Sequence, residues 1–166
     1  MSRTNLIKLN LTSEIFSAYK EKLIGIKKKD IIKQTNKNPE EFISLDQWPK
    51  TSELHCWHCT LTFQSIPKFI PKNFIQDKNI KCHAEGNFCS FNCVMSYINI
   101  HYSSSYNERW RIVNNLYKIY TIFTGNPAPP IIESSPRPYL LTKFGGNLSP
   151  DEYVELISKC SGFYNI

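Results

Sequence analysis

The first part of the chain alternates apolar and polar residues at the spacing of an amphipathic helix. Thr12 or Ser13 can cap the start of this helix, and the lysine-rich stretch 26–41 after it is only weakly periodic. We therefore predict a lysine-rich, helical arm over residues 1–50. Its apolar face consists of residues three or four positions apart, namely Ile15, Phe16, Tyr19, Leu23 and Ile26.

Two helices are predicted in the C-terminal third. The first spans residues 107–123, with Asn107 as its cap and Gly125 as its stop. The second begins after Ser149, where Pro150 takes the first helical position and Glu152 completes a capping box. The shared face predicted for the first helix contains Trp110, Val113, Tyr117 and Tyr120.

The segments between these helices favour extended structure and one further helix. Residues 126–139 contain five prolines, which predicts an extended connector. Residues 79–88 resemble two short strands joined by a turn at 83–86, and the pattern after Ser90 is helical, with Ser90 well placed to cap this helix. We expect a small single domain of the α+β class, mainly helical, in which residues 51–102 form a central module and residues 103–166 pack on it.

Composition supports a globular, intracellular protein. A chain of 166 residues with 41% hydrophobic and 13% aromatic residues can bury roughly 70% of its unfolded surface. The N-terminus lacks the apolar run of a secretory signal, and no stretch approaches the ~18 apolar residues of a membrane span. We expect a reducing compartment and no membrane partner, so paired cysteines favour metal over disulfides.

The net charge of +6 favours anionic partners such as DNA or RNA. A solvated helix face explains the same lysines without any ligand, and this interpretation is slightly favoured over nucleic-acid contact. The candidate contacts are Lys20, Lys22, Lys27, Lys28, Lys29 and Lys33 in the arm, with Arg109 and Arg111 in the predicted helix 107–123.

Four of the six cysteines form two closely spaced pairs. Cys56 and Cys59 fit a C-x-x-C knuckle, and Cys89 and Cys93 are four positions apart, one turn of a helix. A tetrahedral zinc ion takes four such thiolates at about 2.3 Å. We predict one structural zinc ion bound by both pairs. The order of knuckle, hairpin and helix is that of a treble-clef zinc module.

Other assignments of these residues remain open. Cys82 or His83 could replace one of the four ligands, although Cys82 also suits a small buried hydrophobe. A thioredoxin-like redox centre needs a helix after its C-x-x-C motif, which Pro67 and Pro71 oppose, and haem attachment needs histidine where Thr60 stands.

The zinc ion is expected to stabilise the fold and not to catalyse a reaction. Zinc binding in such modules contributes about 10–16 kcal/mol at neutral pH, as much as the stability of a whole domain. Four thiolates leave no open position for water, and no carboxylate or histidine is placed as an obvious general base. We therefore expect a protein that is not an enzyme.

The finger and the tail together resemble a known viral family. The stretch CWHC followed by GNFCSFNCVMSYI is similar to the FCS-type zinc finger of the second late gene transcription factor family of poxviruses and other nucleocytoplasmic large DNA viruses. The later stretches APP and SPRPYLLTKFGGNLSPDEY resemble the proline-rich segment and FGG element of its non-poxvirus members, with the asfarvirus branch the most similar. The resemblance covers about residues 54–157 and leaves the first fifty residues without a family motif.

The resemblance implies a factor for late viral transcription that acts with viral RNA polymerase in factories in the host cytoplasm. It also implies that Cys56, Cys59, Cys89 and Cys93 are the zinc ligands. The alternative is a zinc-stabilised protein–protein interaction module, an adaptor or modulator of host signalling that binds host proteins without touching nucleic acid. The aromatic helix and the proline-rich strip favour this alternative, since either can dock in a partner's groove.

Overall fold

The computed structural model describes residues 38–77 and 79–162, with side chains up to residue 160. The chain divides into two compact units, residues 1–35 and 36–166, and all described residues belong to the second unit. Residues 1–37 of the helical arm predicted for residues 1–50, including its apolar face at residues 15–26, lie outside the described residues. Among those described, no helix is long and apolar enough to cross a membrane.

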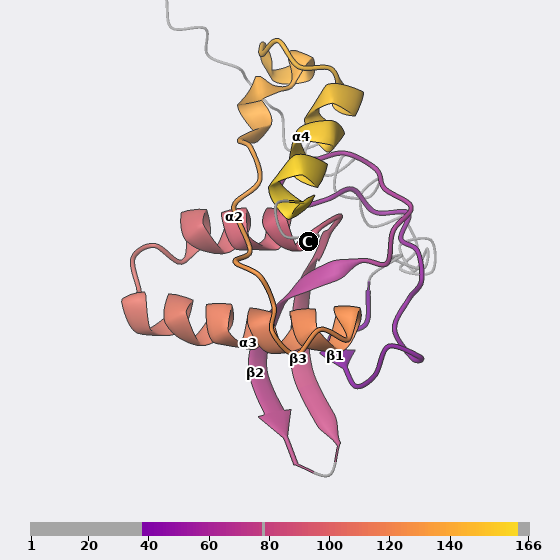
Figure 1. The fold of residues 1–166 in the computed structure, drawn as a ribbon, viewed down its shortest axis with the longest axis vertical. Helices are drawn as coiled ribbons and strands as arrows, with labels where there is room; N and C mark the ends of the chain where they lie inside the picture. Colours follow the sequence, from indigo (N-terminus) through magenta and orange to yellow (C-terminus); the bar gives the residue numbers. More distant parts are fainter. Residues whose placement is uncertain (1–37, 78, 163–166) are drawn as a thin grey trace, which may run out of the picture. The chain divides into compact units, whose positions relative to one another are not determined.

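A three-stranded antiparallel sheet forms the β layer of the second unit (Figure 1). Its strands are β1 (Glu41–Phe42), β2 (Lys68–Gln76) and β3 (Ile80–Phe88), in the order β1-β3-β2. β2 and β3 form a long hairpin, in which Gln76 pairs with Ile80 at one end and Lys68 with Phe88 at the other.

The predicted hairpin within residues 79–88 is wrong, because these residues form the single strand β3. Buried Cys82 and Ala84 alternate with exposed Lys81 and His83, as expected of a strand with one face packed. The hairpin is formed instead by β2 and β3, which pair antiparallel. β2 accommodates Pro71 because it is an edge strand of the sheet formed by the described residues.

Three α-helices complete the described part of the unit, which gives it the expected α+β class. They are α2 (Phe91–His101), α3 (Tyr106–Thr124) and α4 (Pro150–Gly162), and each confirms a helix predicted from the sequence. The capping box of α4 is present: the Glu152 amide donates to Ser149 Oγ at 3.3 Å, and the Ser149 amide donates to the Glu152 carboxylate at 2.8 Å.

Two details of α3 differ from the prediction. The helix starts one residue earlier than expected, with Ser105 at the cap position in place of Asn107, while Gly125 ends it in the left-handed conformation as predicted. Its buried face is also rotated, and Trp110 is 58% exposed. The aromatic residues misled the prediction because they border the buried stripe, which consists of Ile112, Asn115, Leu116 and Ile119.

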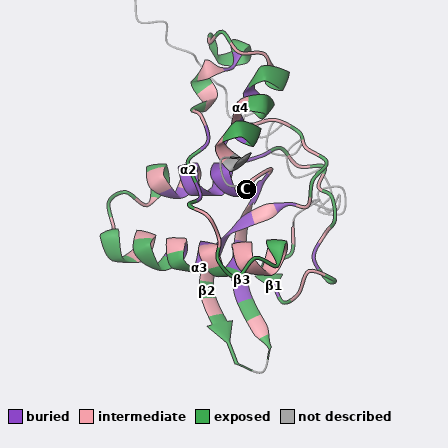
Figure 2. Ribbon diagram, in the orientation of Figure 1, coloured by how far each residue is buried: buried purple, intermediate pink, exposed green. Residues whose placement is uncertain are grey.

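An aromatic cluster holds the sheet and helices together. Figure 2 shows that buried residues are concentrated on α2 and on the part of the sheet beside it. Phe42 of β1 contacts Trp48, Phe69 of β2 and Phe123 of α3, with ring centroids 5.3–5.7 Å apart. The Trp48 indole N–H donates to the Pro67 carbonyl at 2.8 Å, so its one polar atom is satisfied. Residues 38–50 therefore contribute both a strand and core side chains to the described unit.

The proline-rich connector is extended, as predicted, and it lies against α2. Three polar side chains of α2, one turn apart, bind it: Asn92 donates to the Glu133 carbonyl at 3.0 Å, Ser96 to the Ser135 carbonyl at 3.1 Å, and Asn99 to the Ser134 hydroxyl at 2.9 Å. The bonds from Asn92 and Ser96 satisfy backbone carbonyls that a segment without secondary structure cannot pair internally. We refer to residues 126–137 as the strap.

A compact loop connects this strap to α4. It contains two short 3-10 helices, η1 (Pro138–Leu140) and η2 (Thr142–Phe144), and is closed by a bridge between Leu141 and Leu148. Gly146 is packed so closely that a Cβ atom there would lie 2.1 Å from the Leu140 carbonyl oxygen. Only glycine fits this position without moving the backbone.

Gly86 provides a test of how tightly β3 is packed. Its φ is +86°, and a Cβ atom there would lie 2.6 Å from the Phe88 ring and 3.0 Å from the Trp57 ring. We predict that Gly86→Ala lowers the free energy of unfolding by about 2–3 kcal/mol, through backbone strain and steric overlap together.

The matched control is Gly125→Ala, measured by the same denaturant titration. Gly125 also has a positive φ, +71°, but a Cβ atom added there would have no atom within 4 Å of it. The control should therefore lose only about 1 kcal/mol. Equal losses in the two variants would show that the ring contacts at Gly86 are unimportant.

Candidate metal centre

The first half of the centre is the knuckle at residues 56–59, which the backbone holds in a tight turn. The Thr60 amide donates to the Cys56 carbonyl at 2.9 Å, and the Cys56 amide donates to the Leu61 carbonyl at 3.0 Å. Thr60 has a φ of 63°, an uncommon conformation for a β-branched residue. The turn therefore directs both sulfurs to one side at some conformational cost.

The knuckle is attached to β3 by one buried side chain. Asn87 is 1% exposed, and its amide nitrogen donates to the carbonyls of Leu54 and His55 at 3.0 and 3.1 Å. The Trp57 amide donates back to the Asn87 carbonyl at 2.8 Å. This bonding brings the knuckle beside the end of β3, where the second pair of cysteines begins.

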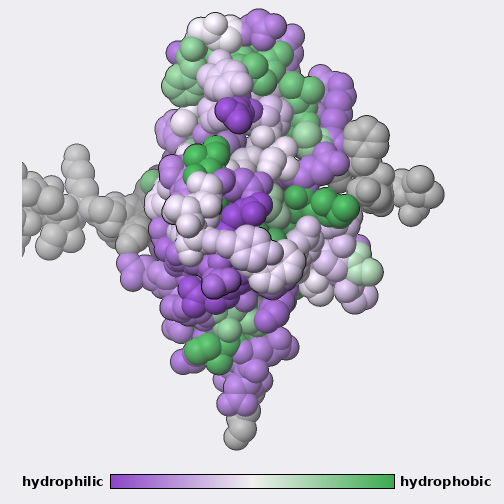
Figure 3. Space-filling view, turned by 90° about the vertical axis from the view of Figure 1, so that its left-hand side faces the viewer, coloured by the Kyte–Doolittle hydropathy of each residue, from purple (hydrophilic) through white to green (hydrophobic). Residues whose placement is uncertain are grey.

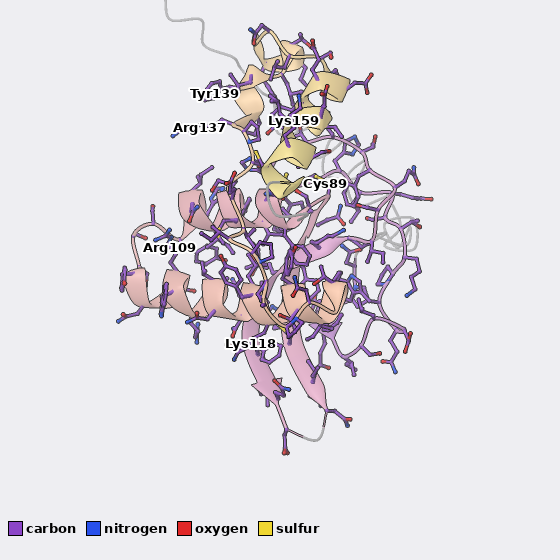
Figure 4. All side chains as sticks on the ribbon, viewed as in Figure 1. Cys89, Arg109, Lys118, Arg137, Tyr139 and Lys159 are labelled. Carbon is purple, nitrogen blue, oxygen red and sulfur yellow. The ribbon has the colours of Figure 1, made fainter. Side chains whose placement is uncertain are left out.

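The second half of the centre is the junction between β3 and α2 (Figure 4). Ser90 is the N-cap of α2, and its hydroxyl accepts a bond from the Cys93 amide at 3.1 Å, as the sequence predicted. Cys93 lies in the first turn, but Cys89 precedes the cap and is not helical. The prediction that Cys89 and Cys93 share a helix face is therefore wrong, although their sulfurs still converge.

The four sulfurs meet at one point. All four lie within 4.8 Å of one another, and the sulfurs are 3.7 Å apart in Cys59–Cys89 and 3.5 Å apart in Cys89–Cys93. Four sulfurs placed tetrahedrally about 2.3 Å from a metal ion are about 3.8 Å apart. The donor set therefore fits a single four-coordinate ion, in the arrangement that the sequence predicted from Cys56, Cys59, Cys89 and Cys93.

The electrostatics of the cluster favour a bound cation. Contact with the Cys59 sulfur lowers the pKa of Cys56, whereas contact with the Cys56 sulfur raises the pKa of both Cys89 and Cys93. The cause is that one thiolate in this buried group opposes the ionisation of its neighbours. A metal cation removes this opposition, since it allows all four thiols to ionise together.

The residues considered as alternative ligands lie outside this cluster. Cys82 is fully buried on β3, where its thiol donates to the Lys72 carbonyl at 3.5 Å, and His83 beside it is exposed. The prediction that Cys82 is a small buried hydrophobe is confirmed. His58, within the knuckle, donates from Nε2 to the Pro136 carbonyl at 3.2 Å, and burial lowers its pKa.

The C-terminal segment supports the knuckle through particular hydrogen bonds, which the predicted packing of residues 103–166 on the module did not specify. The Pro136 carbonyl accepts hydrogen bonds from His58 and from the hydroxyl of fully buried Tyr153 in α4. Lys143, in the loop before α4, donates to the Thr60 carbonyl at 3.1 Å. The sequence signal for this support was the density of prolines and glycines between α3 and α4. That density indicates a fixed loop but does not indicate which part of the fold the loop contacts.

The candidate nucleic-acid contacts fall into two groups. Lys20, Lys22, Lys27, Lys28, Lys29 and Lys33 lie outside the described residues. Arg109 is half-buried, and its guanidinium donates two bonds to the Asn99 side chain at 2.8 and 3.0 Å, which ties α3 to α2. Arg111 is exposed. Arg109 thus has a structural role that the sequence did not reveal.

We predict that purified protein binds one zinc ion and that Cys59→Ser or Cys93→Ser abolishes binding, because serine replaces a thiolate by a weakly acidic hydroxyl. Loss of the ion should also destabilise the fold by several kcal/mol, since binding contributes about 10–16 kcal/mol. Metal analysis and thermal unfolding of the same preparations measure both effects.

Cys82→Ala and Cys160→Ser are the matched controls for this experiment. Neither sulfur belongs to the four-cysteine cluster, so both variants should keep the full metal content. Retention of zinc by the Cys59 and Cys93 variants, or its loss from both controls, would contradict the ligand assignment.

Cys82 should resist alkylation in the folded protein. Burial raises the pKa of its thiol from 9.0 to about 12, so the unreactive neutral form dominates at pH 8. Because the folded state favours the neutral thiol, burial of Cys82 stabilises the fold fully below about pH 9. This stabilisation is lost as the pH rises toward 12. Mass spectrometry after iodoacetamide treatment should find Cys82 modified only in denaturant, and Cys160, which is partly exposed, modified first.

Comparison with known proteins finds viral relatives. The B175L proteins of African swine fever virus, which carry the description uncharacterized, are 32% identical to this chain in isolates from a South African tick and a Kenyan pig and in the Vero-adapted Badajoz strain. The matches extend over 120–123 residues and cover 71% of this chain and 67% of each relative. No protein-family model matches the chain, and no solved structure matches it either.

These relatives agree with the viral origin that the sequence resemblance implied, and their description assigns them no activity. Identity of 32% across two-thirds of each relative is enough to establish common descent. The chain therefore belongs to the family of the African swine fever virus B175L proteins.

Proposed function

We propose that this chain is a zinc-binding late gene transcription factor of a large DNA virus. The observation that supports it most directly is the convergence of the four sulfurs within 4.8 Å. Knuckle, hairpin and helix follow one another along the chain, with ligands in the knuckle, at the end of β3 and in the first turn of α2. This order supports an FCS-type finger of the treble-clef kind, with the hairpin formed by β2 and β3.

The ion in this proposal is structural. Cys56, Cys59 and Cys93 are each 1% exposed or less, so the centre is largely shielded from water. Zinc bound by four thiolates has no open position for a substrate or a water molecule. The ion would supply the positive charge that holds the knuckle against α2, and the protein would act through its surface and not by catalysis.

The contact between finger and tail supports the same family of factors. The resemblance rests on two separate stretches, the cysteine motifs and the later FGG element. In the structure Lys143, next to that element, donates to Thr60, next to the knuckle. Two stretches that resemble one viral family therefore adjoin in space, which is expected if they were retained as one functional unit.

The proposed partner is viral RNA polymerase, with or without DNA or RNA, in the cytoplasmic factories of the host cell. A zinc-stabilised protein adaptor is the second candidate. It is favoured by two exposed aromatic residues one turn apart on α3, Tyr106 at 72% and Trp110 at 58% exposed, because such side chains often anchor protein interfaces.

The two candidates predict different partners in infected cells. If the full chain carries a tag and replaces the viral copy, we expect polymerase subunits to copurify with it, and depletion of the chain to reduce late but not early transcripts. The Cys93→Ser variant should neither copurify with polymerase subunits nor support late transcription, because it cannot bind the ion. The Cys160→Ser variant should do both.

Recovery of host proteins without polymerase subunits, together with normal late transcripts after depletion, would contradict the transcription proposal. The same result would support the adaptor. Messenger RNA sequencing through the infection cycle distinguishes late from early genes, and mass spectrometry of the purified complexes identifies the partners.

A further inference from the structure

Three aromatic rings form a continuous row from the metal-binding knuckle to the end of α2. The Trp57 ring lies 6.0 Å from that of Tyr97, at an interplanar angle of 51°. Tyr97 stacks on His101, one turn further along α2, with centroids 4.0 Å apart and an angle of 27°. We refer to Trp57, Tyr97 and His101 as the aromatic row.

The row rests on a rigid support. Buried Phe88 lies beneath it, with its centroid 6.1 Å from the Trp57 ring and 5.3 Å from that of Tyr97. The absence of a side chain at Gly86 leaves room for the Trp57 ring, because a Cβ atom at residue 86 would contact that ring too closely. Both ends of the row are also fixed, because Trp57 lies between two metal ligands and Tyr97 and His101 belong to a helix.

The rings are nevertheless available to a ligand. Trp57 is 49% exposed, His101 is exposed and Tyr97 is half-buried. An open hollow of about 530 Å³ adjoins the row, lined by Leu54, His55, Cys56, Trp57, Thr60 and Tyr97. A large apolar ring held in place and left half exposed is suited to stacking with a planar partner.

Basic groups border the row. Lys143 donates to the carbonyl of Thr60, and Thr60 lines the hollow. Arg137 comes directly after Pro136, whose carbonyl accepts a hydrogen bond from His58. Arg137 points away from the helices in Figure 4, and Lys72 lies 5.3 Å from the Tyr102 ring just beyond α2. Lys72 is paired with Glu85, so among the described residues we take Lys143 and Arg137 as the candidate contacts for a phosphate backbone.

The surface around the end of α2 is not a continuous apolar face. The side that carries the α2–α3 turn is mainly hydrophilic or intermediate in hydropathy, with small and separate hydrophobic areas (Figure 3). Protein interfaces have an apolar core of fully buried residues. Exposed rings combined with nearby cations match better the stacking platforms that bind single strands.

We propose that the aromatic row is a binding surface for single-stranded nucleic acid, whose unpaired bases stack on Trp57 and His101 while Lys143 and Arg137 contact phosphates. Duplex DNA is a poorer ligand because its bases are already stacked on one another. The biological setting of this interaction, an open transcription complex or a nascent transcript, rests on the proposed function, but the binding itself does not.

The test uses the full-length, zinc-loaded protein and fluorescein-labelled oligothymidylate, oligouridylate and a mixed-sequence duplex. We expect anisotropy to show tighter binding to the single strands and weaker binding as salt rises. Trp57→Ala and His101→Ala should each weaken single-strand binding by about 5- to 160-fold, the range for loss of one stacked base. Trp110→Ala, which removes an exposed tryptophan elsewhere, should leave affinity unchanged.

A second measurement tests base stacking in a variant that retains Trp57, so the result does not depend on the folding of Trp57→Ala. In Trp110→Phe the two remaining tryptophans are Trp57 and Trp48, and Trp48 is only 3% exposed. Stacking of a base on Trp57 should therefore quench the fluorescence of this variant when oligothymidylate is added. Zinc analysis of every variant confirms that the metal centre is intact.

Two outcomes would overturn the proposal. Binding without quenching, and with full affinity in Trp57→Ala and His101→Ala, would assign nucleic-acid contact to other lysines and arginines, eight of which precede residue 36. Absence of oligonucleotide binding, with loss of polymerase copurification in Trp57→Ala, would make the row a protein-binding surface. Failure of the transcription role alone would instead leave base stacking intact while polymerase subunits do not copurify.

Discussion

Repulsion among four closely placed sulfurs is the constraint on which the described unit depends. Within 4.8 Å of one another, Cys56, Cys59, Cys89 and Cys93 can all ionise only around a cation. An ion bound there would link a knuckle, the end of a strand and the first turn of a helix, which also contact one another through the rings of Trp57, Phe88 and Tyr97. The direction in which α2 leaves the sheet follows from this junction.

α2 in turn organises the remainder of the unit. Its first turn carries Cys93, and one side presents Asn92, Ser96 and Asn99 to the strap. Val94 and Ile98, both fully buried, extend the core. The helix thus combines a metal ligand, a hydrogen-bonded face and an apolar face within eleven residues. Few of its positions can change without affecting one of these three contacts.

Sequence reasoning located the local features well. The C-x-x-C knuckle, the Ser90 cap and the Ser149–Glu152 capping box depend on residues a few positions apart, so their spacing in the sequence carries the information. The convergence of the four cysteines was also predictable, because two closely spaced pairs of thiolates can meet around one ion.

Long-range pairing was less accessible. One of the two strand partners of β3 is β2, and β2 contains Pro71, which obscured it as a strand. The half-burial of Arg109 depends on Asn99, and the exposure of Trp110 depends on a helix rotation set by packing against β2. None of these contacts leaves a periodic signal in the sequence, since each partner lies on a different element.

The metal-binding segment depends on the tail of the chain and should not fold when transferred alone to another protein. This follows from the contacts of Pro136 with His58 and Tyr153, and of Lys143 with Thr60. Many small zinc modules can be moved between proteins because the ion and its immediate loops are self-sufficient. Here the knuckle relies for lateral support on residues about eighty positions downstream. Insertions and deletions in the tail are therefore constrained by the geometry of the finger. Substitutions in the finger and in the tail should be correlated among relatives.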